Sequence, residues 1–372
     1  MSLYKIDLYI DGVLVGDVRR LAQNFKWVRR RTKSGADEID FTINDVLFEK
    51  WLSERQYTVS DVLRPMALEC RVSRNGTDIV GGFLATIPAY SPNGTSANLA
   101  LKFDGYLNLL DGVYIYPIGT AVGKMGALVQ RFIGEADTRA TNAGKGYGFT
   151  AVSVSNMASV QHTFDNYKST KEWICDRCDN TEGAGPFDVY FYADKSYAVI
   201  KDSEFGTVIT DWVAVYPTRL NGVSATSITA PEVMGFASRV IGIGAGEVSA
   251  SPSENTAIVS TATNSTAVQK YGYFETIVQD SSISVQSTLN QKVATTLDEQ
   301  SNLAWEPQIT LSGVNVAPVP SGVGKIWLGD TITIKNYEDT TGTMSGAFRV
   351  NELAVDVSAS DGEKITPVLE RA

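Results

Sequence analysis

Apolar and polar residues alternate along several short stretches in the first third of the chain. Every second side chain from Tyr4 to Ile10 is apolar, a period that places these side chains on one face of a half-buried strand. Asp11-Gly12 and Asn75-Gly76 are typical of tight hairpin turns. Further β-rich runs cover residues 25–27, 39–43, 68–72, 80–88 and 97–106. With the amphipathic segment 45–55, these strands can close a small barrel or form a sandwich, so we assign residues 1–110 to a first β-barrel domain.

The hydrophobic period changes from two to that of a helix in the middle of the chain. Five apolar residues share one face of a predicted helix within residues 122–136: Met125, Leu128, Val129, Phe132 and Ile133. Ser169 and Glu172 have the spacing of a capping box and predict the start of a second helix. Two β-rich runs, 187–192 and 196–200, then predict a hairpin. We therefore expect an inserted α+β domain over residues 111–203.

The last part of the chain combines one long amphipathic helix with strands. A strand from Tyr271 precedes the capping residues Asp280, Ser281 and Ser282, so a helix is predicted over residues 282–303. Its apolar stripe, expected to lie on the sheet of a second barrel, is formed by every fourth residue: Val285, Leu289, Val293 and Leu297.

Alternating or β-rich runs predict further strands at 233–243, 305–311, 325–334, 346–357 and 363–370. Two segments rich in Ser, Thr, Asn, Pro and Gly, 250–266 and 314–324, are predicted to be loops or hairpin tips. We assign residues 204–372 to a second β-barrel domain. The expected fold class is mainly β, with two β-barrel domains flanking a small α+β domain.

This order of elements resembles the baseplate hub proteins of phage tails, a family that includes Mu-type tail proteins and the hub portion of tail-associated lysins. Three features carry the resemblance: Tyr271-Gly272 before the capped helix, Leu328-Gly329-Asp330 before a strand, and Phe348-Arg349-Val350-Asn351-Glu352 near the end. The resemblance implies a homotrimer whose six barrels match a sixfold tail tube. It also implies contacts with the tube or distal tail protein, and with a tip or spike/fibre protein.

Composition and charge restrict the classes of function. The chain has 372 residues and 32 glycines, and no apolar run approaches the roughly 20 residues that cross a bilayer. Its start enters strand alternation without an apolar signal region, so we expect a protein made in the bacterial host cytoplasm with no stable membrane insertion. The net charge of −10 excludes general attraction to nucleic acid. In a hub this charge would let DNA pass through the lumen without specific binding, although solubility explains it equally well.

Few residues suggest chemistry. Cys175 and Cys178 form a Cys-x-x-Cys pair, but the remaining soft ligands are only Cys70, about a hundred positions away, and His162, the single histidine. Buried helix cysteines are therefore favoured over a zinc or redox site. His162 lacks the neighbours of a hydrolase triad. A two-carboxylate glycosidase is compatible with the composition, yet no pair stands out. We assign no catalytic, cofactor-binding or metal-binding residue.

Two glycine- or arginine-rich motifs have structural explanations. The motif beginning at Gly242, Gly-Ile-Gly-Ala-Gly, lacks the Gly-Lys-Ser/Thr ending of a phosphate loop and is predicted to be a strand end. Arg29, Arg30 and Arg31, followed by Lys33, are predicted to form a solvated hairpin tip, with contact to an acidic neighbouring subunit as the alternative.

The sequence therefore predicts a structural baseplate hub in the virion tail, a ring that connects the tail tube to the tail tip, encloses the DNA channel and has no enzymatic activity. The alternative is a tail-tip cell-wall hydrolase or a carbohydrate/receptor-binding module that uses Tyr190, Tyr192 and Trp212. Exposure of these three rings distinguishes the two, because a sugar platform must be exposed.

Overall fold

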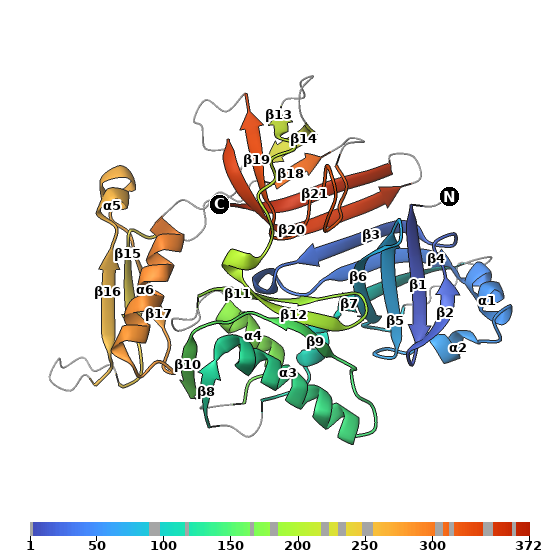
Figure 1. Ribbon diagram of the computed structural model, residues 1–372, viewed down its shortest axis with the longest axis horizontal. Coiled ribbons are helices and arrows are strands. Elements are labelled where there is room, and N and C mark those ends of the chain that lie inside the picture. Colours follow the sequence, from blue (N-terminus) through green and yellow to red (C-terminus); the bar gives the residue numbers. More distant parts are fainter. Residues whose placement is uncertain are drawn as a thin grey trace.

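The computed structural model is mainly β and consists of several sheets with helices on their faces (Figure 1). It describes residues 3–88, 97–115, 119–163, 167–178, 185–216, 223–229, 236–247, 256–301, 308–311, 316–337, 345–358 and 362–372. None of the helices in this part of the chain combines the length and hydrophobicity needed to cross a bilayer.

The predicted strands of the N-terminal part are confirmed. They are β1 (Tyr4–Ile10), β2 (Val13–Asp17), β3 (Gln23–Arg30), β4 (Glu38–Asn44), β5 (Leu68–Arg74), β6 (Thr77–Leu84) and β7 (Asn98–Gly105). The two predicted turns adopt positive φ at both residues, 51° and 80° at Asp11-Gly12 and 50° and 83° at Asn75-Gly76. The amphipathic segment forms α1 (Asp45–Ser53), followed by α2 (Val59–Val62).

The middle of the chain has the predicted α+β character. It contains β8 (Thr120–Lys124), α3 (Met125–Asn142), β9 (Thr150–Val154), β10 (Ser159–Thr163), α4 (Thr170–Cys178), β11 (Phe187–Phe191) and β12 (Ser196–Lys201). The hydroxyl of Ser169 accepts a hydrogen bond from the Glu172 backbone N–H at 3.0 Å, so the predicted N-terminal cap of α4 is present. Short 3₁₀ helices, η1 (Thr32–Ser34), η2 (Tyr106–Leu110) and η3 (Asp202–Glu204), connect strands.

The C-terminal part contains β13 (Ala214–Tyr216), β14 (Val223–Thr229), β15 (Arg239–Ile243), β16 (Val259–Thr263), α5 (Ser265–Tyr271), β17 (Glu275–Gln279), α6 (Gln286–Ser301), β18 (Gln308–Leu311), β19 (Thr331–Asn336), β20 (Gly346–Ser358) and β21 (Gly362–Arg371). The prediction of a loop or hairpin tip over 250–266 is wrong from residue 259 onward, because β16 lies there and the Asn264 side chain caps α5. Tyr271 therefore ends a helix and does not begin a strand. Helix α6 begins four residues later than predicted, and residues 302–303 lie outside the described residues.

The predicted arrangement of two separate barrels is not confirmed. One sheet of thirteen strands runs in the order β19-β13-β14-β18-β21-β20-β3-β4-β7-β6-β5-β1-β2 and so combines both ends of the chain. The sheet joins the two ends of the chain because β20, with thirteen residues, is long enough to pair with strands from both ends. One edge of this strand pairs with β19 over Gly346–Arg349 and with β3 over Glu352–Val357, while β21 pairs along the other edge. The β19–β20 pairing also links six strands, β19, β13, β14, β18, β21 and β20, in a cycle.

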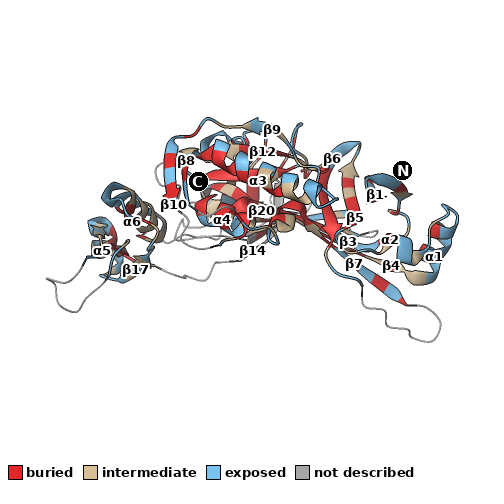
Figure 2. Ribbon diagram, turned by 90° about the horizontal axis from the view of Figure 1, so that it is seen from below, coloured by how far each residue is buried: buried red, intermediate tan, exposed pale blue. Residues whose placement is uncertain are grey.

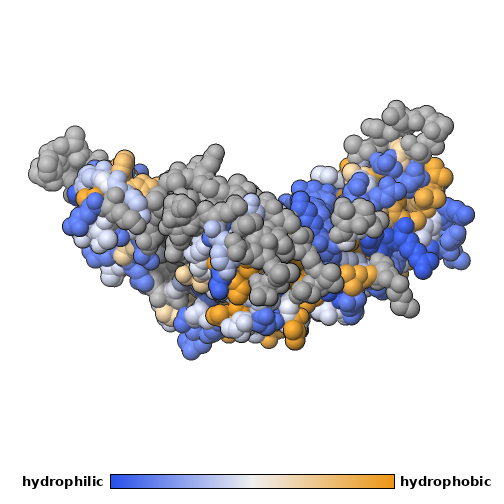
Figure 3. Space-filling view, turned by 90° about the horizontal axis from the view of Figure 1, so that it is seen from above, coloured by the Kyte–Doolittle hydropathy of each residue, from blue (hydrophilic) through white to orange (hydrophobic). Residues whose placement is uncertain are grey.

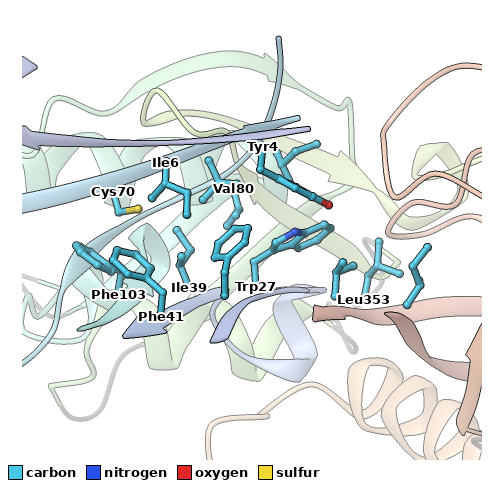
Figure 4. Close-up of a cluster of buried hydrophobic side chains, with 14 of the residues drawn as sticks. Tyr4, Ile6, Trp27, Ile39, Phe41, Cys70, Val80, Phe103 and Leu353 are labelled. Atoms are coloured by element: carbon cyan, nitrogen blue, oxygen red, sulfur yellow. The ribbon is translucent and has the colours of Figure 1, made fainter. Parts of the chain in front are cut away.

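One hydrophobic core extends beneath this sheet. Trp27 is fully buried and packs near Trp327, with ring centroids 6.2 Å apart. Figure 4 shows Trp27 between Tyr4 and Leu353, side chains from opposite ends of the chain. The buried residues concentrate in the central body of the molecule (Figure 2). The strands from the two ends of the chain therefore fold as one packed unit.

Helix α6 does not lie on the main sheet, contrary to the prediction. It covers one face of a small separate sheet, β16-β15-β17, at the left of Figure 1. Leu289 and Val293 are fully buried against this sheet, whereas Val285 precedes the helix and is exposed. Gly242 permits the close packing, because a Cβ at this position would lie 2.3 Å from the Val293 side chain.

Candidate functional site: a buried arginine junction

Two of the three arginines at the end of β3 are buried, so the prediction of a solvated tip is wrong for Arg29 and Arg31, although Lys33 is exposed. Arg29 is 1% and Arg31 4% exposed. Burying a charge is costly unless it is paired, and the partners of both arginines come from distant segments. We call these arginines, with the carboxylates and aromatic rings that contact them, the arginine junction.

Arg31 connects three parts of the chain through its guanidinium. Its Nε and Nη2 atoms donate to one carboxylate oxygen of Asp188 on β11, at 3.0 and 2.7 Å. Nη2 also donates to Asp202 in η3, and Nη1 lies 3.7 Å from Glu370 on β21. Burial alone would lower the pKa of Arg31, but the attraction of Asp188 and Asp202 outweighs it, and the pKa is raised. The guanidinium therefore stays charged within the fold.

Arg29 is held by backbone carbonyls and aromatic rings. It donates to the carbonyl oxygens of Ile79 at 2.6 Å and Phe191 at 2.8 Å, and its Nε lies 3.1 Å from Asp37. Its guanidinium carbon lies 4.2 Å from the Tyr190 ring centroid, a cation–π geometry. Because these partners come from β6, the β11–β12 hairpin and the loop before β4, Arg29 fixes the hairpin against the N-terminal sheet.

Arg349 connects η3 to the C-terminal strands. It donates to Asp202 Oδ2 at 2.6 Å and to the carbonyl oxygens of Asp202 and Phe205, each at 2.7 Å. Burial raises the pKa of the Asp202 carboxyl, but Arg31 and Arg349 lower it by a larger amount, so the net shift is downward. At Glu370, burial also raises the pKa, but the attraction of Lys33 outweighs burial, and the pKa is lowered. Both carboxylates are therefore ionised partners at neutral pH.

Two of the three motifs that carry the resemblance lie at this junction, Leu328-Gly329-Asp330 and Phe348-Arg349-Val350-Asn351-Glu352. Asn351 occupies the bulge of β20, between the segments that pair with β19 and β3, and its carbonyl oxygen accepts from the Arg31 backbone N–H at 3.0 Å. Asp330 is buried and accepts from the backbone N–H groups of Thr207 and Trp327, both at 2.9 Å. Gly329 has φ of +81°, and a Cβ there would lie 2.6 Å from the Phe205 ring. These motif residues thus hold the segments together.

Sequence patterns missed the acidic partners in the junction. Asp188 is 3% exposed although it lies in the β-rich run Phe187-Asp188-Val189. A charged residue inside an otherwise apolar strand was the available signal, because such a residue needs a buried partner. Asp202 and Glu370 carried no comparable signal, since they occur at the ends of elements, where acidic residues are usually solvated.

The structure does not gather the cysteines and the histidine into one site. Cys178 is buried, and its thiol donates to the Cys175 carbonyl oxygen at 3.1 Å within α4. Cys70 belongs to the core under the main sheet, and burial raises its thiol pKa. His162 is buried on β10, with its ring 6.1 Å from that of Trp173. In the described part of the chain, no three His, Cys, Asp or Glu side chains are grouped so that they could hold a metal ion.

The three aromatic rings of the alternative hypothesis do not form a platform. Trp212 is buried and donates its indole N–H to the Lys325 carbonyl oxygen at 2.9 Å. Tyr190 lies over Arg29 and its hydroxyl accepts from Trp327 at 3.2 Å, so only Tyr192, 39% exposed, presents much surface. Figure 3 shows hydrophobic and hydrophilic side chains interspersed over one face of the molecule.

Comparison with known proteins gives a match in structure only. No protein-family model and no curated protein sequence matches the chain. The 43 kDa tail protein of prophage MuSo2 from Shewanella oneidensis has a similar structure, with a TM-score of 0.67 and 9% identity over 99% of this chain and 98% of that one. A tail protein from Neisseria meningitidis MC58 gives 0.65 and 10% over 100% and 97%.

Prophage tail protein gp18 from Listeria monocytogenes EGD-e is also similar, with a TM-score of 0.60 and 12% identity over 99% of this chain and 94% of that one. At such low identities, these matches establish a shared fold. The resemblance to phage tail proteins, including one from a Mu-like prophage, is therefore confirmed at the level of the fold.

Proposed function

We propose that this chain is a structural baseplate hub of a phage tail or a phage-like particle. The observation that carries the proposal is the shared fold with prophage tail proteins over essentially the whole length of both chains. The proposed location is the virion tail, between the tail tube or distal tail protein and a tip or spike/fibre protein. The proposed role is mechanical and involves no chemical reaction.

The strand pairing supports a ring built from two similar modules in each copy. The six strands linked in a cycle form one proposed barrel-like module, and the run from β3 to β2 forms the other. Three copies then present six modules, the number that a sixfold tail tube requires at a threefold tip. The proposed assembly is therefore a homotrimeric ring.

The arginine junction supports this role because a ring needs its modules in a fixed relation. Arg31 contacts the inserted segment through Asp188 and the C-terminal strands through Glu370, so the pieces cannot separate without exposing buried ion pairs. The net charge of −10 agrees with a lumen that repels phosphate, through which DNA passes without specific binding.

Native mass spectrometry of the purified chain and electron microscopy of particles test the proposal. We expect a homotrimer at the end of the tail tube, and particles without the protein should lack the baseplate. A monomer in both settings, or a closed hexamer of the full chain, would remove the symmetry argument. A cell-wall hydrolase or carbohydrate-binding module is the alternative, and the packing of Tyr190 and Trp212 disfavours its aromatic platform.

A further inference from the structure

The two modules of the main sheet share one strand order. In chain order, the equivalent strands are β1, β3, β4, β5, β6 and β7 in the N-terminal module, and β13, β14, β18, β19, β20 and β21 in the C-terminal module. Each module runs from its second strand through the third, sixth, fifth and fourth to the first. The first strand alone differs in direction, since β1 is antiparallel to β5 and β13 is parallel to β19. By this order, β14 is the equivalent of β3, and β6 is the equivalent of β20.

Within one chain, β3 occupies a seat on the C-terminal module. β20 continues beyond its last pair with β19, at Arg349, and pairs with β3 over Glu352–Val357. The connection between β18 and β19 forms the other side of the seat, because it carries Trp327, whose ring centroid lies 6.2 Å from that of Trp27 on β3. The seat therefore consists of an extended fifth strand and the connection between the third and fourth strands.

The equivalent place on the N-terminal module is a groove of about 910 Å³. Past Leu84, the chain leaves β5 and stays beside β7, where the Ala85 backbone N–H donates to the Lys102 carbonyl oxygen at 3.3 Å. The connection between β4 and β5, which carries α1 and α2, forms the other side. The apolar lining comes from these two segments and from β7: Tyr57, Val59, Leu63, Ile87, Pro88 and Leu99.

The groove also presents unpaired backbone groups at Thr86 and Ile87. The Ile87 side chain is 67% exposed, and neither residue makes a backbone hydrogen bond in the part of the chain that the structure describes. In the C-terminal module, the equivalent stretch of β20 pairs with β3. The groove therefore combines an apolar wall with free backbone donors and acceptors, the two features that an incoming strand requires.

β14 has the open edge that such a groove accepts. Opposite β18, β14 pairs with β13 only at Val223 and Ser224, so Ala225–Thr229 have no partner strand on that side among the described residues. β3 uses the corresponding edge, opposite β4, to pair with β20. An open strand edge is a template for pairing with another chain. β14 and α1–α2 lie apart on the molecule (Figures 1 and 2), so a chain does not fill its own groove.

We propose that β14 of a second copy lies in this groove, with its open edge along residues 85–88. The contact between copies then repeats the relation of β3 to β20 within each chain, so every module holds a strand of the next module. Three copies joined in this head-to-tail way close into a ring of six modules. This contact rests on the proposed homotrimer and supplies the surface that forms it.

Native mass spectrometry of two matched variants tests the groove. Ile87→Asp places a charge in the apolar wall and should convert the trimer to a folded monomer, with association weakened by about a hundredfold. Ile277→Asp changes an isoleucine of β17 that is 63% exposed and should leave the trimer unchanged. Circular dichroism should show both variants folded, because both side chains are exposed. A folded Ile87→Asp protein that stays trimeric overturns the inference and leaves the proposed ring intact.

Disulfide crosslinking identifies the partner strand. Thr86→Cys is combined with a cysteine at each position from Ala225 to Thr229 in turn, and at least one pair should give disulfide-linked oligomers of up to three copies. Thr86→Cys alone, which retains the native cysteines, should give none. Trimers that no pair crosslinks would refute the inference but not the ring. A chain that is monomeric both in solution and in particles would overturn the ring and this contact together.

Discussion

Removal of the Arg31 guanidinium tests whether the arginine junction stabilises the whole fold. Arg31→Ala removes two hydrogen bonds donated to Asp188, which is 3% exposed in the unmodified protein, and removes a cation next to Asp202 and Glu370. Breaking a buried ion pair by deleting one partner costs about 3–5 kcal/mol. We therefore expect Arg31→Ala to lower the free energy of unfolding by about this amount.

The matched control is Arg131→Ala, which removes an arginine of the same size from an exposed helix pair with Glu135 at 2.7 Å. Exposed pairs of this spacing contribute about 0.3–0.5 kcal/mol. Urea denaturation followed by tryptophan fluorescence and circular dichroism measures both variants. If Arg31→Ala costs less than about 1 kcal/mol, the junction does not stabilise the fold as argued.

The junction also predicts a pH dependence with a definite sign. The pKa values of Asp202 and Glu370 are lowered in the folded protein, so each carboxylate stabilises the fold at pH values above its ordinary pKa. This stabilisation is lost as the pH falls through the folded pKa. The stability of the unmodified chain should therefore fall more steeply below about pH 4 than that of Arg31→Ala. Parallel curves would contradict the assigned ion pairs.

Three further predictions concern the small sheet with its helix and the cysteine pair. Leu289→Asp should cost several kcal/mol because it buries an unpaired charge, whereas exposed Gln291→Ala should cost little, and equal melting temperatures would show that α6 is not docked as described. Ion pairing and hydrogen bonds overcome burial to lower the pKa of Asp280 to about 2, so Asp280→Asn should remove on the order of 2 kcal/mol at pH 7, and the difference from the unmodified protein should vanish as the pH falls toward 2. Cys175→Ser with Cys178→Ser should leave assembly intact, and elemental analysis of the unmodified protein should find no stoichiometric zinc; one tightly bound metal per chain would contradict this.

Local chemistry was sufficient to predict most of the individual elements. Asp11-Gly12 tolerates the positive φ that its turn requires, and Ser169 supplies a cap to α4 within three residues of its partner. The alternation from Tyr4 to Ile10 identified a strand whose buried face is Tyr4, Ile6, Leu8 and Ile10. Such features depend on neighbours within a few residues, so the linear sequence contains the information needed to recognise them.

The tertiary structure alone decided how these elements combine. The partners of Arg31 include a carboxylate 157 residues away, so a run of charges that is usually solvated became a buried junction. The amphipathic period of α6 showed that one face is buried but could not say which sheet covers it, because the period specifies an apolar face and not its partner. Sequence patterns identify what a side chain needs, and the folded chain determines which distant group supplies it.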